Sequence, residues 1–142
     1  MAEGHSPRSE SLVAVEEAQQ VASKIAKKYG RFECDRCARE VAKRLREKVD
    51  ATFERLCTAD KSDVIGLAEE GIQISANRVH VGIRIGDKII DNLHPEGVPS
   101  SEWAGRFISA TDAPLVQQSR PIQEFFGKIF LVKKFYRWLF SF

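Results

Sequence analysis

The stretch from residue 80 to residue 92, HVGIRIGDKIIDN, constrains the fold more than any other, because it has the pattern of a β-hairpin. Two runs rich in β-branched residues flank Gly86 and Asp87, a dipeptide suited to a tight two-residue turn. If these two residues form the loop, Ile83 faces Ile90 across the strands. The sequence therefore predicts an antiparallel pair of strands whose register is set by its own turn.

The same register places His80 and Asp91 on one face of the hairpin. Side chains alternate between the faces of a strand, and Gly82, opposite Asp91, has no side chain to separate it from His80. A carboxylate at that distance can hold an imidazole in one tautomer and orientation. In the plainer interpretation, His80 ends a strand and Asp91 belongs to a turn. A slip of one residue in register would put the two side chains on opposite faces.

Length and composition indicate one globular domain. The chain has 142 residues, of which 43% are hydrophobic and 30% are charged, as in an ordinary protein with a sizeable core. Its net charge of +2 gives no support for nucleic acid as the main ligand. We expect a disordered lead-in over residues 1–10, the domain over residues 11–121, and a Phe-rich basic segment over residues 122–142.

The cysteine count and the N-terminus indicate where the protein works. Three cysteines, Cys34, Cys37 and Cys57, are a low and odd number for a disulfide framework, so we expect reduced thiols. The N-terminal sequence MAEGHSPRSES lacks the apolar stretch of a secretory signal peptide. We therefore expect a protein that acts in the cytoplasm, or one that a dedicated secretion route delivers into a target cell.

Two helices are predicted before the hairpin. The first begins near Ser11 and ends near Gly30, with apolar residues at three- and four-residue steps. The second follows the segment that contains both Cys34 and Cys37 and runs to about Lys48, so that Cys34 lies in or just before its first turn. In its first turn the thiolate of Cys34 is favoured by the helix dipole and by free backbone N–H groups. Cys37 lies one turn deeper, where a thiol is more often packed.

The other segments are short, and they alternate between strands, loops and one brief helix. A helix that starts at Ser100 or Ser101 is expected to pack Trp103 and Phe107. The remaining expectations are a strand over 51–58, a short helix or turn over 63–68, a strand over 71–75, an exposed loop over 92–99 and a loop over 109–121.

The segment 122–142 is rich in Phe and is predicted to be an amphipathic helix. Its Lys and Arg residues fall inside the apolar run, which argues against a helix that spans a bilayer. Packing within the protein or against a partner ranks first. A basic helix at a membrane surface ranks below it.

Cys34, His80 and Asp91 together supply a nucleophile, a base and an orienting carboxylate. The imidazole would take the proton of the thiol, and the carboxylate would fix the imidazole. A cysteine on an N-terminal helix, followed by a histidine on a strand hairpin, is also the chain order of papain-like cysteine enzymes.

Two segments, YGRFECDRCAREVAKRL and ISANRVHVGIRIGDKIIDNLHPEGVPSSEW, resemble the papain-fold toxin domains of bacterial polymorphic toxin systems, and in particular the papain fold toxin 2 group. The resemblance covers roughly residues 20–107. It implies an α+β, papain-like cysteine-enzyme fold, with N-terminal helices followed by a small antiparallel sheet. It also implies Cys34 as nucleophile, His80 as general base and Asp91 as orienter, with Cys37 as an alternative nucleophile.

The activity that the resemblance implies is acyl transfer through a thioester. Peptide hydrolysis by a protease, side-chain deamidation and transfer to another amine share the same first half, in which a thiolate attacks a carbonyl carbon. The implied partners are a protein substrate in a competing or host cell and a cognate immunity protein. The chemistry needs no cofactor and no metal.

Three other interpretations use the same residues. Cys34, Cys37, His80 and His94 provide four potential zinc ligands, although their spacing matches no usual zinc motif and Asp91 would have no role. A redox Cys-x-x-Cys pair would need a strand directly before the helix, where this sequence has a long helix. A non-catalytic interaction module with a papain-like scaffold would use the Phe-rich segment as its contact surface.

Overall fold

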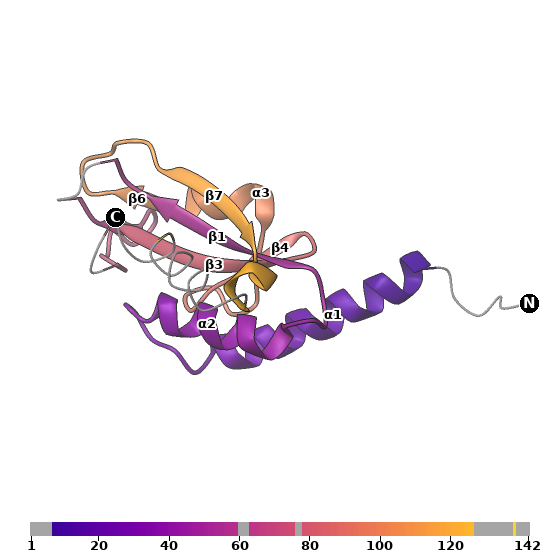
Figure 1. Cartoon of the computed structure of the whole chain (residues 1–142). Coiled ribbons are helices and arrows are strands. Elements are labelled where there is room, and N and C mark those ends of the chain that lie inside the picture. The colour runs from indigo at the N-terminus through magenta and orange to yellow at the C-terminus, as the bar shows by residue number, and fades with distance from the viewer. Residues whose placement is uncertain (1–6, 60–62, 76–77, 127–137, 139–142) are drawn as a thin grey trace, which may run out of the picture.

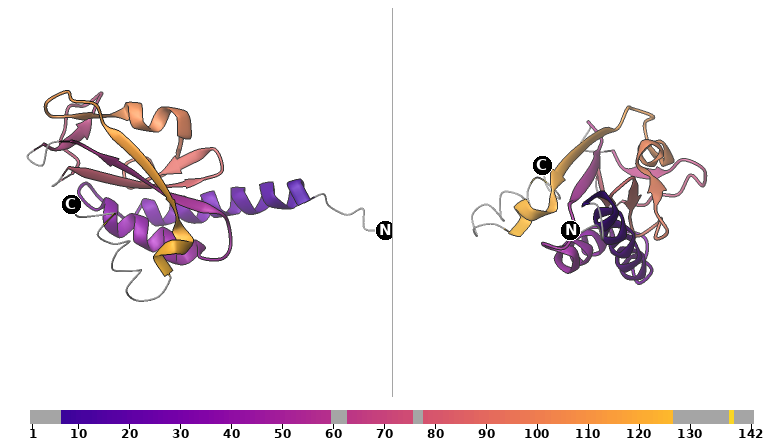
Figure 2. Two further views of the ribbon diagram at one scale, coloured as in Figure 1. Left: turned by 45° about the horizontal axis from the view of Figure 1, so that its top comes forward. Right: turned by 90° about the vertical axis from the view of Figure 1, so that its right-hand side faces the viewer.

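Two helices lie side by side against one face of an antiparallel sheet, and shorter elements cover the other face (Figure 1). The turned views in Figure 2 show the same layers. The helices are α1 (Pro7–Ala26) and α2 (Cys34–Leu45). This computed structural model describes residues 7–59, 63–75, 78–126 and 138. Within those ranges, no helix has the length and apolar character needed to cross a bilayer.

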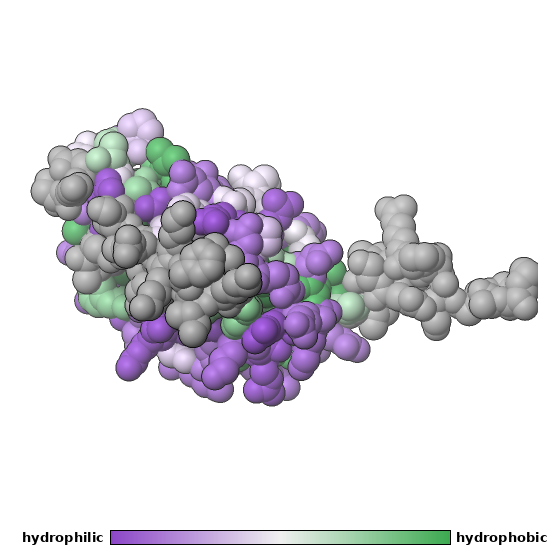
Figure 3. All heavy atoms as spheres, viewed as in Figure 1, coloured by the Kyte–Doolittle hydropathy of each residue, from purple (hydrophilic) through white to green (hydrophobic). Residues whose placement is uncertain are grey.

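α2 turns a stripe of small and apolar residues toward the sheet. The spacing of three and four residues keeps these side chains on one side of the helix. The outer faces of the two helices are largely hydrophilic (Figure 3), as is usual for helices that cover a sheet. The buried residues of α2 are Cys34, Cys37, Ala38, Val41, Ala42 and Leu45.

α1 differs from its prediction at both ends. It begins at Pro7, four residues before the predicted start at Ser11, and proline is well suited to the first turn of a helix because it needs no N–H partner there. It ends at Ala26, and the chain turns before Gly30. Residues 7–10 therefore belong to the helix, so the predicted lead-in is too long by these residues.

The main sheet has five strands in the order β5-β4-β3-β1-β7, and every neighbouring pair is antiparallel. A second sheet pairs two short strands, β2 with β6. Helices packed against antiparallel strands confirm the predicted α+β class. The strands and remaining helical turns are β1 (Ala51–Cys57), β2 (Ile65–Leu67), β3 (Val79–Ile85), β4 (Lys88–Ile90), β5 (Val98–Pro99), α3 (Ser100–Trp103), the 3-10 turn η1 (Ala104–Arg106), β6 (Phe107–Ser109), β7 (Val116–Pro121) and the 3-10 turn η2 (Ile122–Phe126).

β3 and β4 form the predicted hairpin in the predicted register. Ile83 pairs with Ile90, and the two-residue turn between the strands includes Gly86 with a φ of +66°. A side chain at Gly86 would be strained by that φ, and its Cβ would lie 2.7 Å from Cγ1 of Val15 on α1. Glycine at this position therefore fixes the turn and lets α1 pass close to it.

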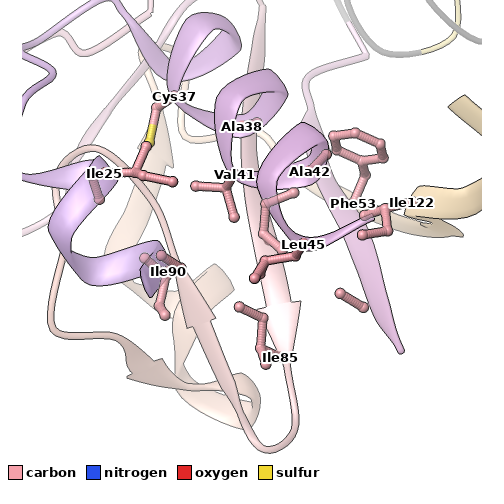
Figure 4. Packing of buried hydrophobic residues seen from close by; sticks show 14 of the residues in the cluster. Ile25, Cys37, Ala38, Val41, Ala42, Leu45, Phe53, Ile85, Ile90 and Ile122 are labelled. Atoms are coloured by element: carbon pink, nitrogen blue, oxygen red, sulfur yellow. The ribbon is translucent and has the colours of Figure 1, made fainter. Parts of the chain in front are cut away.

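The sheet separates two hydrophobic clusters. Trp103 of α3 is wholly buried in the cluster on the side away from the helices. Gly82 makes room for this indole, because a Cβ there would lie 3.1 Å from Cζ2 of Trp103. The indole thereby reaches the ring of His80, at a centroid distance of 5.8 Å. On the helix side (Figure 4), the stripe of α2 packs with residues that include Ile25, Phe53, Ile85, Ile90 and Ile122.

Several short strands were not predicted. The helix or turn expected over 63–68 is wrong, because Ile65–Leu67 forms strand β2. The loop expected over 109–121 is also wrong, because β7 occupies Val116–Pro121 and pairs along β1. Nearly every side chain of β7 is exposed, so this strand has no apolar alternation that could have revealed it.

The segment expected as an exposed loop over 92–99 is partly buried. Asn92 is 6% exposed and Val98 is 3% exposed. Val98 pairs with Ile89 in β5, which forms the edge of the sheet beside β4. The strand expected over 71–75 is reduced to one isolated bridge, between Gly66 and Gln73.

Of the Phe-rich segment 122–142, the structure describes η2 (Ile122–Phe126) and Trp138, and the rest of the predicted helix lies outside the described residues. Trp138 packs against the cluster on the helix side. The guanidinium carbons of Arg55 and Arg120 lie 5.7 Å and 5.0 Å from its ring centroid. These described residues pack within the protein, as the first-ranked interpretation expects.

Candidate active site

α2 presents Cys34 as its first residue. Glu33, the residue before it, makes no side-chain cap hydrogen bond, because its carboxylate binds other groups. One oxygen accepts a hydrogen bond from the backbone N–H of Gly30 at 2.8 Å, and the other accepts one from Arg36 at 3.2 Å. With no side-chain acceptor from the N-cap residue, Cys34 lies at the positive end of the helix dipole, beside the free backbone N–H groups of the first turn.

The hairpin brings His80 and Asp91 together as predicted. Nε2 of His80 lies 2.9 Å from Oδ2 of Asp91, and both side chains are 0% exposed. His80 lies near the start of β3, and Asp91 directly follows the end of β4. The two-residue turn therefore sets the contact, because a slip of one residue would separate the pair.

The carboxylate of Asp91 accepts hydrogen bonds at both oxygens. Oδ2 receives Nε1–H of Trp103 at 2.8 Å in addition to His80. Oδ1 receives the backbone N–H groups of Leu93 and His94 at 2.9 Å and 2.6 Å, and it lies 3.0 Å from Nδ1 of His94. Burial alone raises the pKa of Asp91, but the bonds from the two histidines outweigh it and hold that pKa well below its ordinary value. Asp91 is therefore a carboxylate at neutral pH.

The ionised carboxylate fixes the tautomer of His80. A carboxylate only accepts, so Nε2 of His80 carries a hydrogen and the neutral ring has its lone pair on Nδ1. Among the residues that the structure describes, none forms a hydrogen bond of good geometry with the buried Nδ1. Burial lowers the pKa of His80, but the hydrogen bond with Asp91 and the interaction with the Cys34 thiol raise it above its ordinary value. The ring is thus prepared to hold a proton beside Cys34.

Aromatic rings exclude water from this pair. The ring of His80 packs against Trp103 and Phe107, with centroid distances of 5.8 Å and 4.7 Å, and these two rings also contact each other at 5.4 Å. Phe107 also meets His94 edge to face at 5.7 Å. A pair shielded in this way interacts more strongly than it would in water, because the local dielectric constant is low.

Asn92 links the two halves of the site. Its Nδ2 donates a hydrogen bond of 2.8 Å to the carbonyl oxygen of Gly30. Gly30 lies four residues before Cys34, and Asn92 directly follows Asp91. The amide therefore connects the loop that leads to Cys34 with the turn that carries Asp91.

Cys37, the alternative nucleophile, lies in the hydrophobic cluster between the helices and the sheet. It is 2% exposed, and its sulfur points toward Ile25 in Figure 4. Burial raises the pKa of Cys37 to about 12, with smaller contributions from Asp91 and Cys34. A thiol of this kind is almost wholly protonated at neutral pH and is a poor nucleophile. The geometry therefore favours Cys34 over Cys37.

The arrangement does not support the zinc interpretation. His80 and His94 both face Asp91, and in the described part of the chain no group of three or more His, Cys, Asp or Glu side chains could hold a metal ion. Cys34 and Cys37 are free thiols. Sequence reasoning assigned His94 to the zinc alternative and Trp103 to packing, and it missed that both donate to Asp91. A buried indole needs an acceptor, which was the available signal for Trp103.

Comparison with known protein families finds a match over more than half of the chain. The family model for papain fold toxin 2 matches residues 16–108, a range that contains Cys34, His80, Asp91 and Trp103. Neither a curated protein nor a solved structure matches the chain.

Proposed function

The chain belongs to the papain fold toxin 2 family, and on that premise we propose that it is a cysteine-dependent acyl-transfer toxin domain, a protease or a deamidase, that acts on proteins. One observation carries the proposal. Nε2 of His80 is held by Asp91 at 2.9 Å, while Nδ1 has no competing partner and the Cys34 thiol interacts with the ring. A thiol, an oriented imidazole and a carboxylate in this order form a nucleophile, a base and an orienter.

The reaction follows from these positions. In the reactive form the proton of the Cys34 thiol resides on Nδ1 of His80, consistent with the raised pKa of that ring, and the thiolate attacks the carbonyl carbon of an amide. The resulting oxyanion needs donors, and the uncapped first turn of α2, with the backbone N–H of Cys34, is suited to provide one. The C–N bond then breaks, the amine takes the proton from His80, and a thioester remains on Cys34. Water or another amine releases the acyl group.

Asp91 keeps its charge through this cycle. It stabilises the imidazolium of His80 and holds the ring so that Nδ1 stays directed to the thiol. The leaving group distinguishes the reactions, because a protease releases a peptide amine and a deamidase releases ammonia. We expect the target to be a protein of a competing or host cell, reached by a dedicated delivery route. A cognate immunity protein is expected to bind the domain.

Growth of bacteria that express the domain intracellularly tests the proposal. Wild type is compared with Cys34→Ala, Cys37→Ala and His80→Ala at matched amounts of folded protein, with Cys57→Ala as a matched control for the loss of a thiol. We expect wild type and the Cys37 and Cys57 variants to inhibit growth, and the Cys34 and His80 variants to be harmless.

Two outcomes would contradict this assignment. If Cys37→Ala is harmless and Cys34→Ala still inhibits growth, the nucleophile is Cys37. If Cys34→Ala inhibits growth as strongly as wild type and no other variant differs, the domain acts without a cysteine nucleophile, as the interaction module would.

A further inference from the structure

Asp91 holds a second histidine besides His80. Nδ1 of His94 lies 3.0 Å from Oδ1, and Nε2 of His80 lies 2.9 Å from Oδ2, so the two imidazoles occupy opposite oxygens of one carboxylate. The side chain of His94 is 17% exposed, whereas that of His80 is wholly buried. The proposed reaction assigns no step to His94, so its position calls for a separate explanation.

The geometry fixes the hydrogen on His94. Oδ1 of the ionised Asp91 can only accept, so Nδ1 of His94 must donate. The backbone N–H of His94 donates to the same oxygen at 2.6 Å, and that of Leu93 does so at 2.9 Å. One residue therefore binds Oδ1 through both its backbone and its ring. The edge-to-face contact with Phe107 keeps the ring of His94 in this orientation.

We propose that His94 is a positioning residue for the Cys34–His80–Asp91 set. Its ring N–H holds Oδ1, so that the carboxylate does not rotate about its Cβ–Cγ bond and Oδ2 stays directed at Nε2 of His80. The orientation of Nδ1 toward Cys34 then depends on His94 through two successive hydrogen bonds. This inference rests on the proposed function, because it assumes that His80 activates Cys34.

The reactivity of Cys34 toward iodoacetamide at neutral pH tests both the proposed function and the role of His94, and it needs no known substrate. Cleavage by trypsin after Arg31, Arg36 and Arg39 places Cys34 and Cys37 on separate peptides, 32–36 and 37–39, so mass spectrometry can follow each thiol separately. Wild type compared with His80→Ala tests the proposed function. A histidine-dependent excess of Cys34 alkylation is the expected result.

Three substitutions then test His94. His94→Ala removes the donor, His94→Asn places an amide N–H near the position of Nδ1, and His94→Gln places it one bond too far. We expect His94→Ala and His94→Gln to lower the Cys34 alkylation rate roughly tenfold, as for loss of a hydrogen bond to a charged group. His94→Asn is expected to restore most of the wild-type rate. The Asn and Gln variants decide the question even if His94→Ala does not fold.

Thr111→Val is the matched control. It removes a side-chain donor from another buried carboxylate, Asp63, where Oγ1 of Thr111 lies 2.7 Å from Oδ2. It is expected to leave Cys34 alkylation at the wild-type rate. Equal rates for wild type and folded His94→Gln would overturn the inference about His94 alone, and so would equal losses in the Asn and Gln variants. Equal rates for wild type and His80→Ala would overturn the proposed function instead.

Discussion

Glu54 and Asp91 are two buried carboxylates on the same side of the molecule, and only one of them belongs to the candidate site. Each is 1% exposed. Glu54 lies in the middle of β1 and pairs with Gly82, two residues along β3 from His80. Asp91 follows the end of the hairpin. The two regions therefore have the same burial, on β1 and directly after β4, two strands that both pair with β3, and they differ in what surrounds the carboxylate.

The two carboxylates differ in the groups that donate hydrogen bonds to them. Glu54 accepts from Nε2 of Gln117 and Oγ of Ser119 at 2.7 Å and 2.6 Å, and from Oγ1 of Thr52 at 2.5 Å. None of these groups exchanges a proton near neutral pH. Asp91 accepts from two imidazoles and an indole, and one imidazole interacts with a thiol. A buried carboxylate with neutral donors holds strands together, and one with titratable donors beside a nucleophile can control a reaction.

The largest expected difference between the two regions is in thiol reactivity. Asp91→Asn replaces an acceptor with an amide that can donate to His80, which favours the wrong tautomer. We expect it to abolish growth inhibition and to lower Cys34 alkylation about 100-fold or more. Glu54→Gln, the matched change in the other region, is expected to stay within about twofold of wild type. Equal losses of growth inhibition and of Cys34 alkylation in the two variants would show that the donors around Asp91 do not distinguish it from Glu54.

The pH dependence of stability is the next expected effect. The pKa of His80 is raised to about 10, so its proton stabilises the folded state fully below the ordinary value of about 6.5, and this stabilisation is lost as pH rises toward 10. For wild type, we expect the free energy of unfolding, measured by urea denaturation, to decrease as the pH rises between these two values. The slope should be absent in His80→Gln and retained in Glu54→Gln. A wild-type profile that is flat over this interval would show that the imidazole is not held charged.

At low pH, Asp91 is expected to change stability with pH in the opposite direction to His80. Its pKa is lowered, so its contribution is present above the ordinary value of about 4 and is lost as pH falls through the folded value. Acid unfolding measured by circular dichroism should therefore be steeper in wild type than in Asp91→Asn.

The same comparison shows how far the sequence could predict the site. The hairpin register, the contact between His80 and Asp91, and the place of Cys34 at a helix start follow from local rules, because turn chemistry and strand alternation act over a few residues. The hydrogen bonds that Trp103 and His94 donate to Asp91 could not be predicted from local rules. They depend on how α3 and the turn after β4 pack against the hairpin.

The region of Glu54 was not predicted at all. Its donors Gln117 and Ser119 lie on β7, a strand whose exposed polar residues carry no apolar period. Only pairing with β1 makes this segment a strand, and that pairing joins residues about 60 to 70 positions apart. Long-range pairing of this kind decides secondary structure against local preference, which is why the loop prediction there was wrong.

A smaller difference between the two regions is expected in the free energy of unfolding. Glu54→Ala leaves the donors from Gln117 and Ser119 without their acceptor, and we expect the free energy of unfolding to fall by about 1–3 kcal/mol. Ser119→Ala removes one donor and leaves two, so its cost should be about 1 kcal/mol or less. Denaturation in urea measures both. At matched amounts of folded protein these variants should inhibit growth like wild type, and a loss of inhibition would place Glu54 in the site.

The smallest expected effect concerns the loop before Cys34. Phe32 has a φ of +72° and is 43% exposed, so the backbone is strained at a residue that is only partly buried. Glu47, just beyond the other end of α2, has a φ of +64° and serves as a matched position. We expect Phe32→Gly and Glu47→Gly each to raise the free energy of unfolding by up to about 1 kcal/mol, because glycine adopts these angles without strain. If the strain serves the site, Phe32→Gly alone will also reduce growth inhibition and Cys34 alkylation. If both variants behave alike in both assays, the strained loop is a feature of how α2 begins, and the chemistry depends on the residues that surround Asp91.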